Sequence, residues 1–307
     1  MRKNVTYNTT PAFKRSKLAK FKTDYGAWLL VLPSLIFIYF FTLRPIFTGM
    51  WYSLHHMQGY EILEFCGLQN YKDVLSDTRF IKVLINTLKY VVWSLVLGYL
   101  PPVIVAVMLN EMMHGKRFFK FALYIPNMVP SIVTSLLWYF MYRPDASGLL
   151  NTLLLTFGGQ TSQWLQNEKL TIILIIVTTT WGAFGSSVLM YLAALQGVNN
   201  ELYEATLLDG AGFIRRIFTV ALPRISGIML LFLANQIICV FKIMDQPLAM
   251  TGGGPNNASM SLGLWSYYNG FVSFDVEASL ATGVITFLIL VVLTSFYHIL
   301  KNKVEQD

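Results

Sequence analysis

Residues 201–223 read ELYEATLLDGAGFIRRIFTVALP, a polar interruption between two long apolar runs. A short helix is expected at its start, because either Asn199 or Asn200 can cap one there. Glu201 and Glu204 fall in the first turn, where the helix dipole favours acidic side chains. The segment therefore has the signals that begin a helix outside the apolar runs.

The second half of this 201–223 segment carries the signals of a turn and of another helix. Gly210, directly after Asp209, is expected to end the first helix, because glycine accepts the left-handed conformation that helix ends often require. Residues 214–220 predict a second helical run, and Pro223 suits the first turn of the next helix. A compact helix–turn–helix between two apolar runs indicates a surface built for docking.

The composition is that of a membrane protein. Of the 307 residues, 55% are hydrophobic and only 13% are charged, whereas a soluble domain carries about 25% charged residues. The net charge of +7 then bears on orientation and on attraction to anionic lipid. Nucleic acid is not an expected partner, because its binding motifs are missing. The two cysteines, Cys66 and Cys239, are too few for a disulfide framework or a zinc site.

Six runs meet or approach the length of about 20 apolar residues that a membrane span needs. We therefore predict an all-α, polytopic membrane protein with six transmembrane helices. The predicted organisation is a basic tail (1–24), a transmembrane domain (25–300) and a second short tail (301–307). The predicted spans are about 26–51, 83–110, 119–142, 171–195, 223–243 and 278–300.

Lysine and arginine are distributed unequally between the two sides of this predicted bundle. With the N-terminus inside, the inner side holds the basic tail and three further clusters: Lys116, Arg117 and Lys120; Arg215, Arg216 and Arg224; and Lys301 and Lys303. The outer loops hold fewer basic residues. The excess predicts that both termini, and the 201–223 segment, lie in the cytoplasm.

Two of the outer loops have a recognisable character. Between Arg143 and Lys169, the sequence GLLNTLLLTFGG is apolar but too short to span, which predicts an interfacial or protein-covered helix bounded by Gly148 and Gly158. Residues 251–259 read TGGGPNNAS, a composition that predicts an irregular loop.

The candidate motifs for chemistry do not support an enzyme. The triple glycine at 252–254 lacks the Lys-Ser or Lys-Thr pair of a phosphate loop, and no Walker A sequence occurs in the chain. An intramembrane enzyme needs carboxylates, histidines or an activated serine at membrane depth. The acids and the four histidines fall instead in loops or near the ends of the spans. We expect no catalytic residue, metal or cofactor in this chain.

Uncharged polar residues do occur within the spans: Asn86, Thr87, Thr178, Thr179, Thr180, Ser186, Ser187, Asn235 and Gln236. One interpretation is hydrogen bonding between helices. The other is a pathway for an uncharged polar solute, with Trp181, Phe184, Asn235 and Gln236 as the best candidates. A sugar ring offers C–H faces for aromatic stacking and hydroxyls for amide hydrogen bonds. The sequence leaves both interpretations open.

The 201–223 segment resembles the EAA loop of ABC importer permeases, in which Glu-Ala-Ala is followed by three residues, a glycine, and later Ile-x-Leu-Pro. Here the pattern is Glu204-Ala205-Thr206, then Gly210, then Val220-Ala221-Leu222-Pro223. The spacing matches, and Thr206 and Val220 are the two departures. In that family the loop is the coupling helix that sits in a cleft of the ATPase subunit.

Other stretches resemble carbohydrate importers of the maltose type. They are GLQNYKDVL (67–75), NTLKY (86–90), YIPNMVPSIVTSLLW (124–138) and TGGGPNNAS (251–259). The glycine-rich loop is similar to that of the larger maltose permease. The basic N-terminus and the sequence around Trp51 resemble polysaccharide and oligosaccharide permeases of Gram-positive bacteria. The resemblance covers about residues 25–300.

This resemblance implies a type I ABC importer permease in the bacterial plasma membrane, working by alternating access on an oligo- or polysaccharide. The implied partners are a second permease subunit, two ATPase subunits that carry Mg-ATP, and an extracellular solute-binding lipoprotein. Glu204 would anchor the coupling helix, Gly210 would allow its turn, Ala205 and Ala211 would keep the contact close, and Pro223 would fix the entry into the fifth span. The residues implied in coupling are Glu204, Ala205, Asp209, Gly210, Ala211 and Pro223.

Three alternatives remain at this point. A stand-alone secondary carrier or channel would transport without any ATPase. A membrane-bound scaffold or enzyme would function without the 201–223 segment. A permease for a non-sugar solute such as glycerol phosphate would need cations at the depth of its pocket, where the sequence offers only Lys89 and Lys242.

Overall fold

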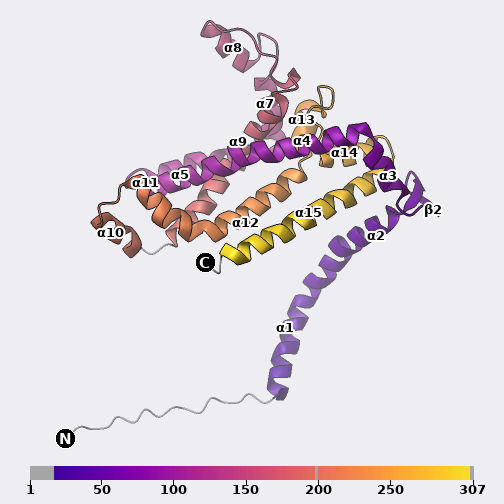
Figure 1. The fold of residues 1–307 in the computed structure, drawn as a ribbon, viewed down its shortest axis with the longest axis horizontal. Helices are drawn as coiled ribbons and strands as arrows, with labels where there is room; N and C mark the ends of the chain where they lie inside the picture. The colour runs from indigo at the N-terminus through magenta and orange to yellow at the C-terminus, as the bar shows by residue number, and fades with distance from the viewer. Residues whose placement is uncertain (1–16, 198–199, 305–307) are drawn as a thin grey trace. The chain divides into compact units, whose positions relative to one another are not determined.

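The computed structural model describes residues 17–197 and 200–304, most of which are helical (Figure 1). Residues 1–16 of the basic tail, the predicted cap Asn199 and residues 305–307 lie outside the described residues. The chain divides into two compact units, Met1–Trp51 and Tyr52–Asp307, which are described separately.

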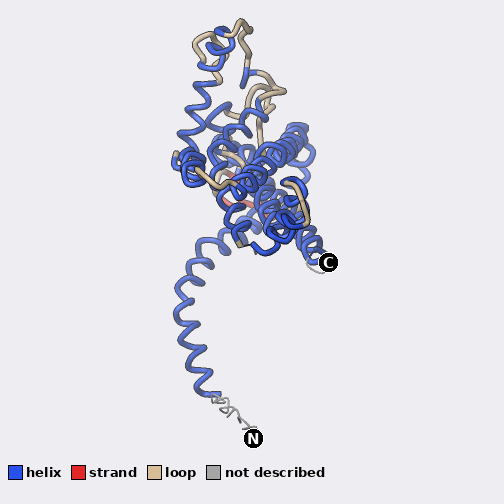
Figure 2. Tube along the Cα trace, turned by 90° about the vertical axis from the view of Figure 1, so that its left-hand side faces the viewer, coloured by secondary structure: helices blue, strands red, loops and turns tan. Residues whose placement is uncertain are grey.

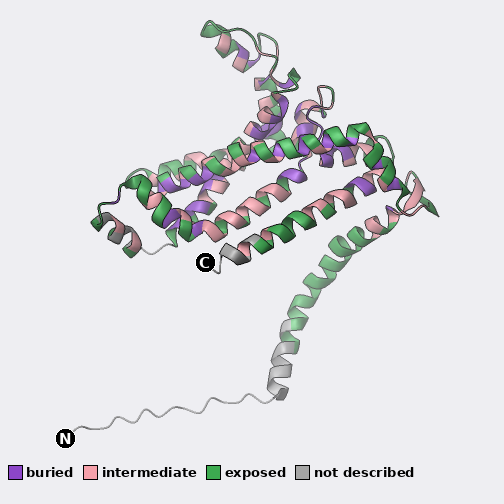
Figure 3. Cartoon of the chain, viewed as in Figure 1, coloured by how far each residue is buried: buried purple, intermediate pink, exposed green. Residues whose placement is uncertain are grey.

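The first unit is an apolar helix. α1 (Lys17–Ile38), the π-helical turn η1 (Tyr39–Leu43) and α2 (Arg44–Tyr52) follow one another without a break. The stretch Trp28–Tyr52 is long and apolar enough to cross a membrane, and its side chains are unburied (Figure 3). This agrees with the first predicted span, although the helix already begins within the predicted basic tail.

The second unit begins with an antiparallel hairpin of β1 (His55–Gln58) and β2 (Glu61–Phe65), drawn in red in Figure 2. Glu277 fastens the hairpin to α15 (Val276–Val304), because its Oε2 accepts a hydrogen bond from Met57 N at 2.9 Å. The all-helical prediction did not include these two strands. They are short, and their mixed polarity lacks the alternation that identifies a strand.

The other elements of the second unit are helical. They are α3 (Gln69–Ser76), α4 (Thr78–Ser94), η2 (Leu95–Tyr99), α5 (Leu100–Glu111), α6 (Lys116–Tyr124), η3 (Ile125–Met128), α7 (Ser131–Met141), α8 (Leu149–Thr156), η4 (Trp164–Gln166), α9 (Thr171–Gln196), α10 (Asn200–Leu208), α11 (Phe213–Arg216), η5 (Ile217–Ala221), α12 (Leu222–Phe241), α13 (Asp245–Thr251), α14 (Leu262–Tyr267), η6 (Tyr268–Val272) and α15. The short helix α8 lies between Gly148 and Gly158, as predicted.

Five helices among the described residues can cross a membrane by length and composition: Trp28–Tyr52, Thr78–Glu111, Thr171–Gln196, Phe213–Phe241 and Val276–Ile299. A sixth span results if the pair Lys116–Met128 and Ser131–Met141 is counted as one, and its halves meet at 91°. Pro126 and Pro130 account for the break, because proline removes a backbone donor and disfavours helix at the residue before it. The predicted third span, 119–142, is therefore two helices.

The fifth span begins well before its predicted start at residue 223. α11, η5 and α12 form one helix from Phe213 to Phe241. Pro223 is the second residue of α12 and lies in its first turn, as predicted, but α12 continues from the π-helical turn η5 without a break. A π turn shifts the hydrogen-bond pairing by one residue, which accommodates a residue without an N–H group.

α9 is the central helix of the second unit, and it packs against α4, α5, α6, α7 and α12. Val188, Tyr191, Leu192 and Leu195 of α9 belong to a buried cluster with side chains of α5 and α12. Gly185 allows the closest approach, since a Cβ there would overlap the carbonyl oxygen of Leu123 in α6. The absence of a side chain at this position sets the distance between α9 and the broken third span.

Candidate functional site

Helix α10 ends as the sequence predicts. Gly210 has a φ of +72°, in the left-handed region, and Ala211 N donates to Thr206 O at 3.0 Å. A left-handed glycine followed by this backward bond is the usual glycine cap at a helix C-terminus. The predicted turn at Asp209–Gly210 is confirmed.

The helix and its turn present an exposed surface. Glu204, Asp209 and Gly210 are exposed, and Leu208 is 90% exposed, although leucine is normally a core residue. Ala211, behind the turn, is buried. Ala205 lies within α10, but its side chain is outside the described residues. An exposed leucine between acidic residues is suited to contact with another protein.

An ion pair connects the base of this loop to the second span. Arg216 Nη2, in α11, lies 2.8 Å from Glu111 Oε2, at the end of α5, and both side chains are mostly buried. α11 also continues directly into α12. The 201–223 segment is therefore linked to α5 through this ion pair as well as to α12 through the backbone.

We expect Glu111→Gln to destabilise the protein by about 1–3 kcal/mol, because it leaves the partly buried Arg216 guanidinium without its counter-charge. The midpoint of thermal unfolding in detergent measures the loss. The exchanged pair, Glu111→Arg with Arg216→Glu, serves as the control and should recover part of that stability. An unchanged midpoint in Glu111→Gln would show that the pair contributes nothing.

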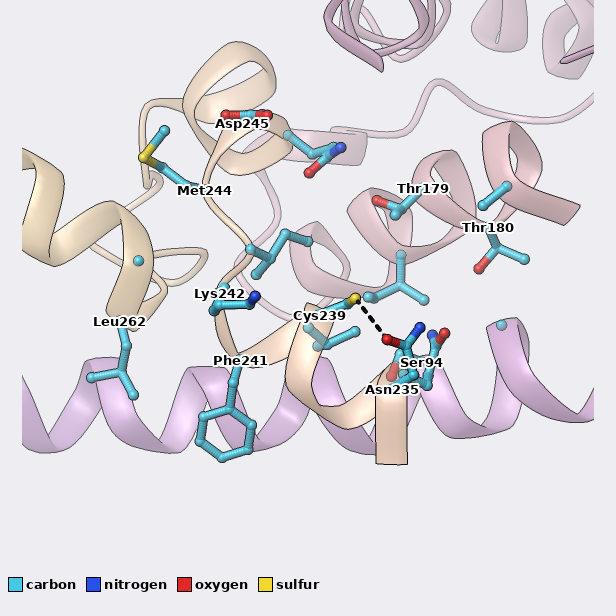
Figure 4. Close-up of a pocket in the computed structure, with 18 of the residues that line it drawn as sticks. Ser94, Thr179, Thr180, Asn235, Cys239, Phe241, Lys242, Met244, Asp245 and Leu262 are labelled. Atoms are coloured by element: carbon cyan, nitrogen blue, oxygen red, sulfur yellow. Dashed lines mark hydrogen bonds between the residues drawn. The ribbon is translucent and has the colours of Figure 1, made fainter. Parts of the chain in front are cut away.

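A cavity with a volume of about 830 Å³ lies among the helices of the second unit. Its wall combines α9 and α12 with residues of α4, α14, α15 and the connection from α12 to α13. Figure 4 shows Thr179 and Thr180 on α9 facing Asn235 and Cys239 on α12, where Cys239 Sγ lies 3.9 Å from Asn235 Oδ1. Hydroxyl and amide groups thus converge on a space of the size that small-molecule sites have.

Three of the four predicted pathway residues line this cavity: Phe184, Asn235 and Gln236. Gly98 brings the backbone of η2 close to them, since a Cβ there would lie 3.1 Å from Gln236 Nε2. Trp181 is not part of the wall. Its ring packs edge-to-face on Trp138, with centroids 5.8 Å apart, so it belongs to the contact between α9 and α7.

The sequence analysis missed several residues of the cavity wall. Asp245 and Gln246 follow the end of α12 and line the cavity, as do Ser94, Ser266 and Thr286; Lys242, which the sequence analysis considered as a pocket cation, also lines it. The signal for Asp245 and Gln246 is their position, shortly after the last turn of the fifth span. The others give no signal, because a single serine or threonine in a span usually bonds within its own helix.

Two other polar residues of the spans have a structural role. Asn86 Nδ2 donates to Asn257 O at 2.7 Å, and Thr87 Oγ1 accepts from Leu262 N at 3.0 Å. The buried Tyr90 hydroxyl donates to Ser259 O at 3.0 Å. These groups of α4 therefore hold the predicted irregular loop and the start of α14. For Asn86 and Thr87, hydrogen bonding within the protein is a better interpretation than a pathway for a solute.

A bundle of apolar helices that surrounds a polar cavity and carries an exposed, glycine-capped helix at one end is a membrane permease. The chain belongs to the family described as binding-protein-dependent transport system inner membrane component, whose model matches residues 98–306. It is therefore a membrane-embedded transport subunit and not an enzyme.

Curated relatives match almost the whole chain. The sn-glycerol-3-phosphate transport system permease protein UgpA of Escherichia coli (strain UTI89 / UPEC) is 30% identical over 288 residues, which are 93% of this chain and 97% of the relative. The protein of the same name from Yersinia pestis bv. Antiqua (strain Antiqua) is 31% identical over the same lengths.

Solved structures show the same fold. A bacterial ABC transporter involved in the import of the acidic polysaccharide alginate contains a chain that matches with a TM-score of 0.82 at 20% identity, covering 94% of this chain and 99% of that one. A chain of the inward-facing MetNI methionine ABC transporter matches with a TM-score of 0.54 at 16% identity, covering 77% and 98%. The helical architecture is that of an ABC importer permease.

Proposed function

We propose that this chain forms half of the translocation pathway of an ATP-driven importer for an oligo- or polysaccharide. The observation that carries the proposal is the cavity between α9 and α12, where Asn235, Gln236 and the α9 hydroxyls stand beside the ring of Phe184. Amides and hydroxyls bind sugar hydroxyls, and an aromatic face stacks on the C–H side of a sugar ring.

The charges of the cavity favour a neutral solute. Among the lining residues that the structure describes, Lys242 is the one cation and Asp245 the one acid, so their charges cancel. A phosphate group is usually bound by several cations or by a helix N-terminus. Lys89, the other cation considered from the sequence, is exposed and does not line the cavity. Transport of a glycerol phosphate, the solute named for the curated relatives, is the second candidate.

The proposed partners are a second permease subunit, two ATPase subunits that bind Mg-ATP, and an extracellular solute-binding lipoprotein. The proposed orientation has both termini in the cytoplasm, with α10 in a cleft of an ATPase subunit. The exposed Glu204 and Leu208 and the glycine-capped turn support this assignment. Family membership supports the need for a binding protein.

Reconstitution in liposomes tests the proposal. The complete transporter with its binding protein should take up a neutral oligosaccharide only when ATP is supplied, and this chain alone should take up none. Uptake by the isolated chain would establish a secondary carrier or channel. Uptake of glycerol 3-phosphate without any uptake of sugar would establish the second candidate.

We expect Gln236→Leu to lower the rate of sugar uptake about three- to tenfold, because one hydrogen bond to the solute is worth about 0.5–1.5 kcal/mol. Basal ATP hydrolysis without solute should stay unchanged. Gln160→Leu, the same exchange at an exposed loop position, is the matched control. Equal uptake by the two variants would remove Gln236 from the pathway.

A further inference from the structure

A second, smaller cavity lies beside the first, between α7, α9 and α13, and has a volume of about 360 Å³. We call it the side cavity. Thr179, Ala183 and Gln246 line both cavities, so the two are neighbours that share a wall. The break between η3 and α7 forms the far wall of the side cavity, with Asn127 and Ser131 on either side of it.

The side cavity is polar and uncharged along the lining that the structure describes. Ser135 and Thr179 each donate their hydroxyl to a carbonyl of their own helix, at 2.8 and 2.9 Å, which leaves their lone pairs available as acceptors. Asn127 Oδ1 accepts from Ser186 Oγ at 3.1 Å, so its amide nitrogen is the end left to donate. The cavity thus offers both donors and acceptors to a hydroxylated ligand.

Thr134 supplies an independent observation. It lines the side cavity, is only 4% exposed, and its Oγ1 has no hydrogen-bond partner among the described residues. An unpaired buried hydroxyl is unfavourable and calls for an explanation, such as a ligand that is bound in another state. The Thr134 methyl is the nearest group to Gly182, since a Cβ on Gly182 would lie in ordinary contact with Thr134 Cγ2, at 3.7 Å. A single χ1 rotation exchanges that methyl for the hydroxyl.

The size of the side cavity exceeds what a bridging water needs. A water occupies about 30 Å³ in the liquid, and one or two waters usually satisfy an isolated buried group. Here the volume reaches the lower range of small-molecule sites. A ligand with several hydroxyls fits the donor set, and the lining residues common to both cavities place it next to a ring in the larger one.

We propose that the side cavity is a second solute subsite, which holds one further sugar ring while the preceding ring occupies the larger cavity. The inference rests on the proposed function and deepens it: the pathway is built for connected rings, and a single ring in the larger cavity leaves the side cavity unused. Thr134 binds a hydroxyl of the further ring, and the absence of a side chain at Gly182 provides the space for it.

The first experiment measures chain-length preference in the complete transporter, reconstituted with its partners. Neutral gluco-oligosaccharides of one to five rings compete for uptake. Gly182→Leu fills the side cavity and should lower the ratio of long-chain to short-chain uptake at least about fivefold, and Thr134→Val should lower it about threefold. Thr282→Val is the matched control, because Thr282 also has a buried, unpartnered hydroxyl but lines neither cavity. It should leave the ratio unchanged.

A cysteine at the site gives a readout that does not depend on Gly182→Leu being tolerated. Thr134→Cys, in a background of Cys66→Ser and Cys239→Ser, should react with hydroxyethyl methanethiosulfonate. Sugars of two or more rings should protect it at least about fivefold better than a single ring does.

Equal length preference in wild type and Gly182→Leu, or equal protection by all sugars, would overturn the inference and leave the side cavity with water or lipid. A wild type that carries no sugar at all but does carry another solute would instead overturn the proposed function.

Discussion

Gly210→Val is expected to reduce ATP-driven uptake to background while the protein remains in the membrane. The φ of +72° at Gly210 is a conformation that a β-branched residue rarely adopts, and the strain opens the turn that Ala211 N closes on Thr206 O. The exposed C-terminal end of α10 then changes its direction relative to α11. Uptake in proteoliposomes, together with the amount of protein in the membrane, measures the effect.

Gly212→Val is the matched control for this experiment. Like Gly210, Gly212 has no atom within 4 Å of a Cβ built on it, but its φ of −68° suits any residue. Glu204→Lys reverses a charge on the exposed face of α10 without touching the turn, and it too should abolish uptake. Normal transport by both Gly210→Val and Glu204→Lys would show that the 201–223 segment is only a linker.

Gly185→Val is expected to have the largest effect on stability, a loss of about 3 kcal/mol or more. Overpacking with side chains that can yield costs about 1–3 kcal/mol. At Gly185 the atoms in the way are backbone: the Leu123 carbonyl and, at 2.8 Å, the Tyr124 Cα. α9 and the broken third span would have to separate. The yield of monodisperse protein and the midpoint of thermal unfolding in detergent report the loss.

Gly182→Ala, one turn earlier on α9, provides the comparison, because the nearest atom to its Cβ is a methyl at an ordinary 3.7 Å. We expect its unfolding midpoint to match that of wild type. A Gly185→Val variant as stable as Gly182→Ala would mean that α6 and α9 do not cross so closely in the membrane.

The parts of this fold that the sequence predicts are those set by local chemistry. Gly210 could be placed in a left-handed turn because no other residue type serves there equally well. The apolar runs predict the spans to within a few residues, except where Pro126 and Pro130 divide the third and where the helix of the fifth begins ten residues before Pro223. Proline marks a change in backbone pairing, but it does not say whether the helix stops, bends or continues through a π turn.

The cavity is harder to predict, because it depends on the rotation of each helix about its own axis. α9 is apolar or weakly polar on all sides, so its sequence does not reveal which face meets the cavity. Trp181 therefore looked as suitable as Phe184, although the two are three positions apart on α9 and only Phe184 lines the cavity. Lys242 belongs to the connection from α12 to α13 and Asp245 is the first residue of α13, so both reach the cavity only through the tertiary arrangement of these helices.

The hydrogen bonds from Asn86, Thr87 and Tyr90 to residues 257–262 have a consequence for the entropy of association at this loop. These bonds within the chain hold the loop in one conformation without the help of a partner. A protein that docked on this loop would have little chain disorder to remove, and its association would lose less conformational entropy. Such a contact would therefore be tighter than one made by a loop that must first become ordered.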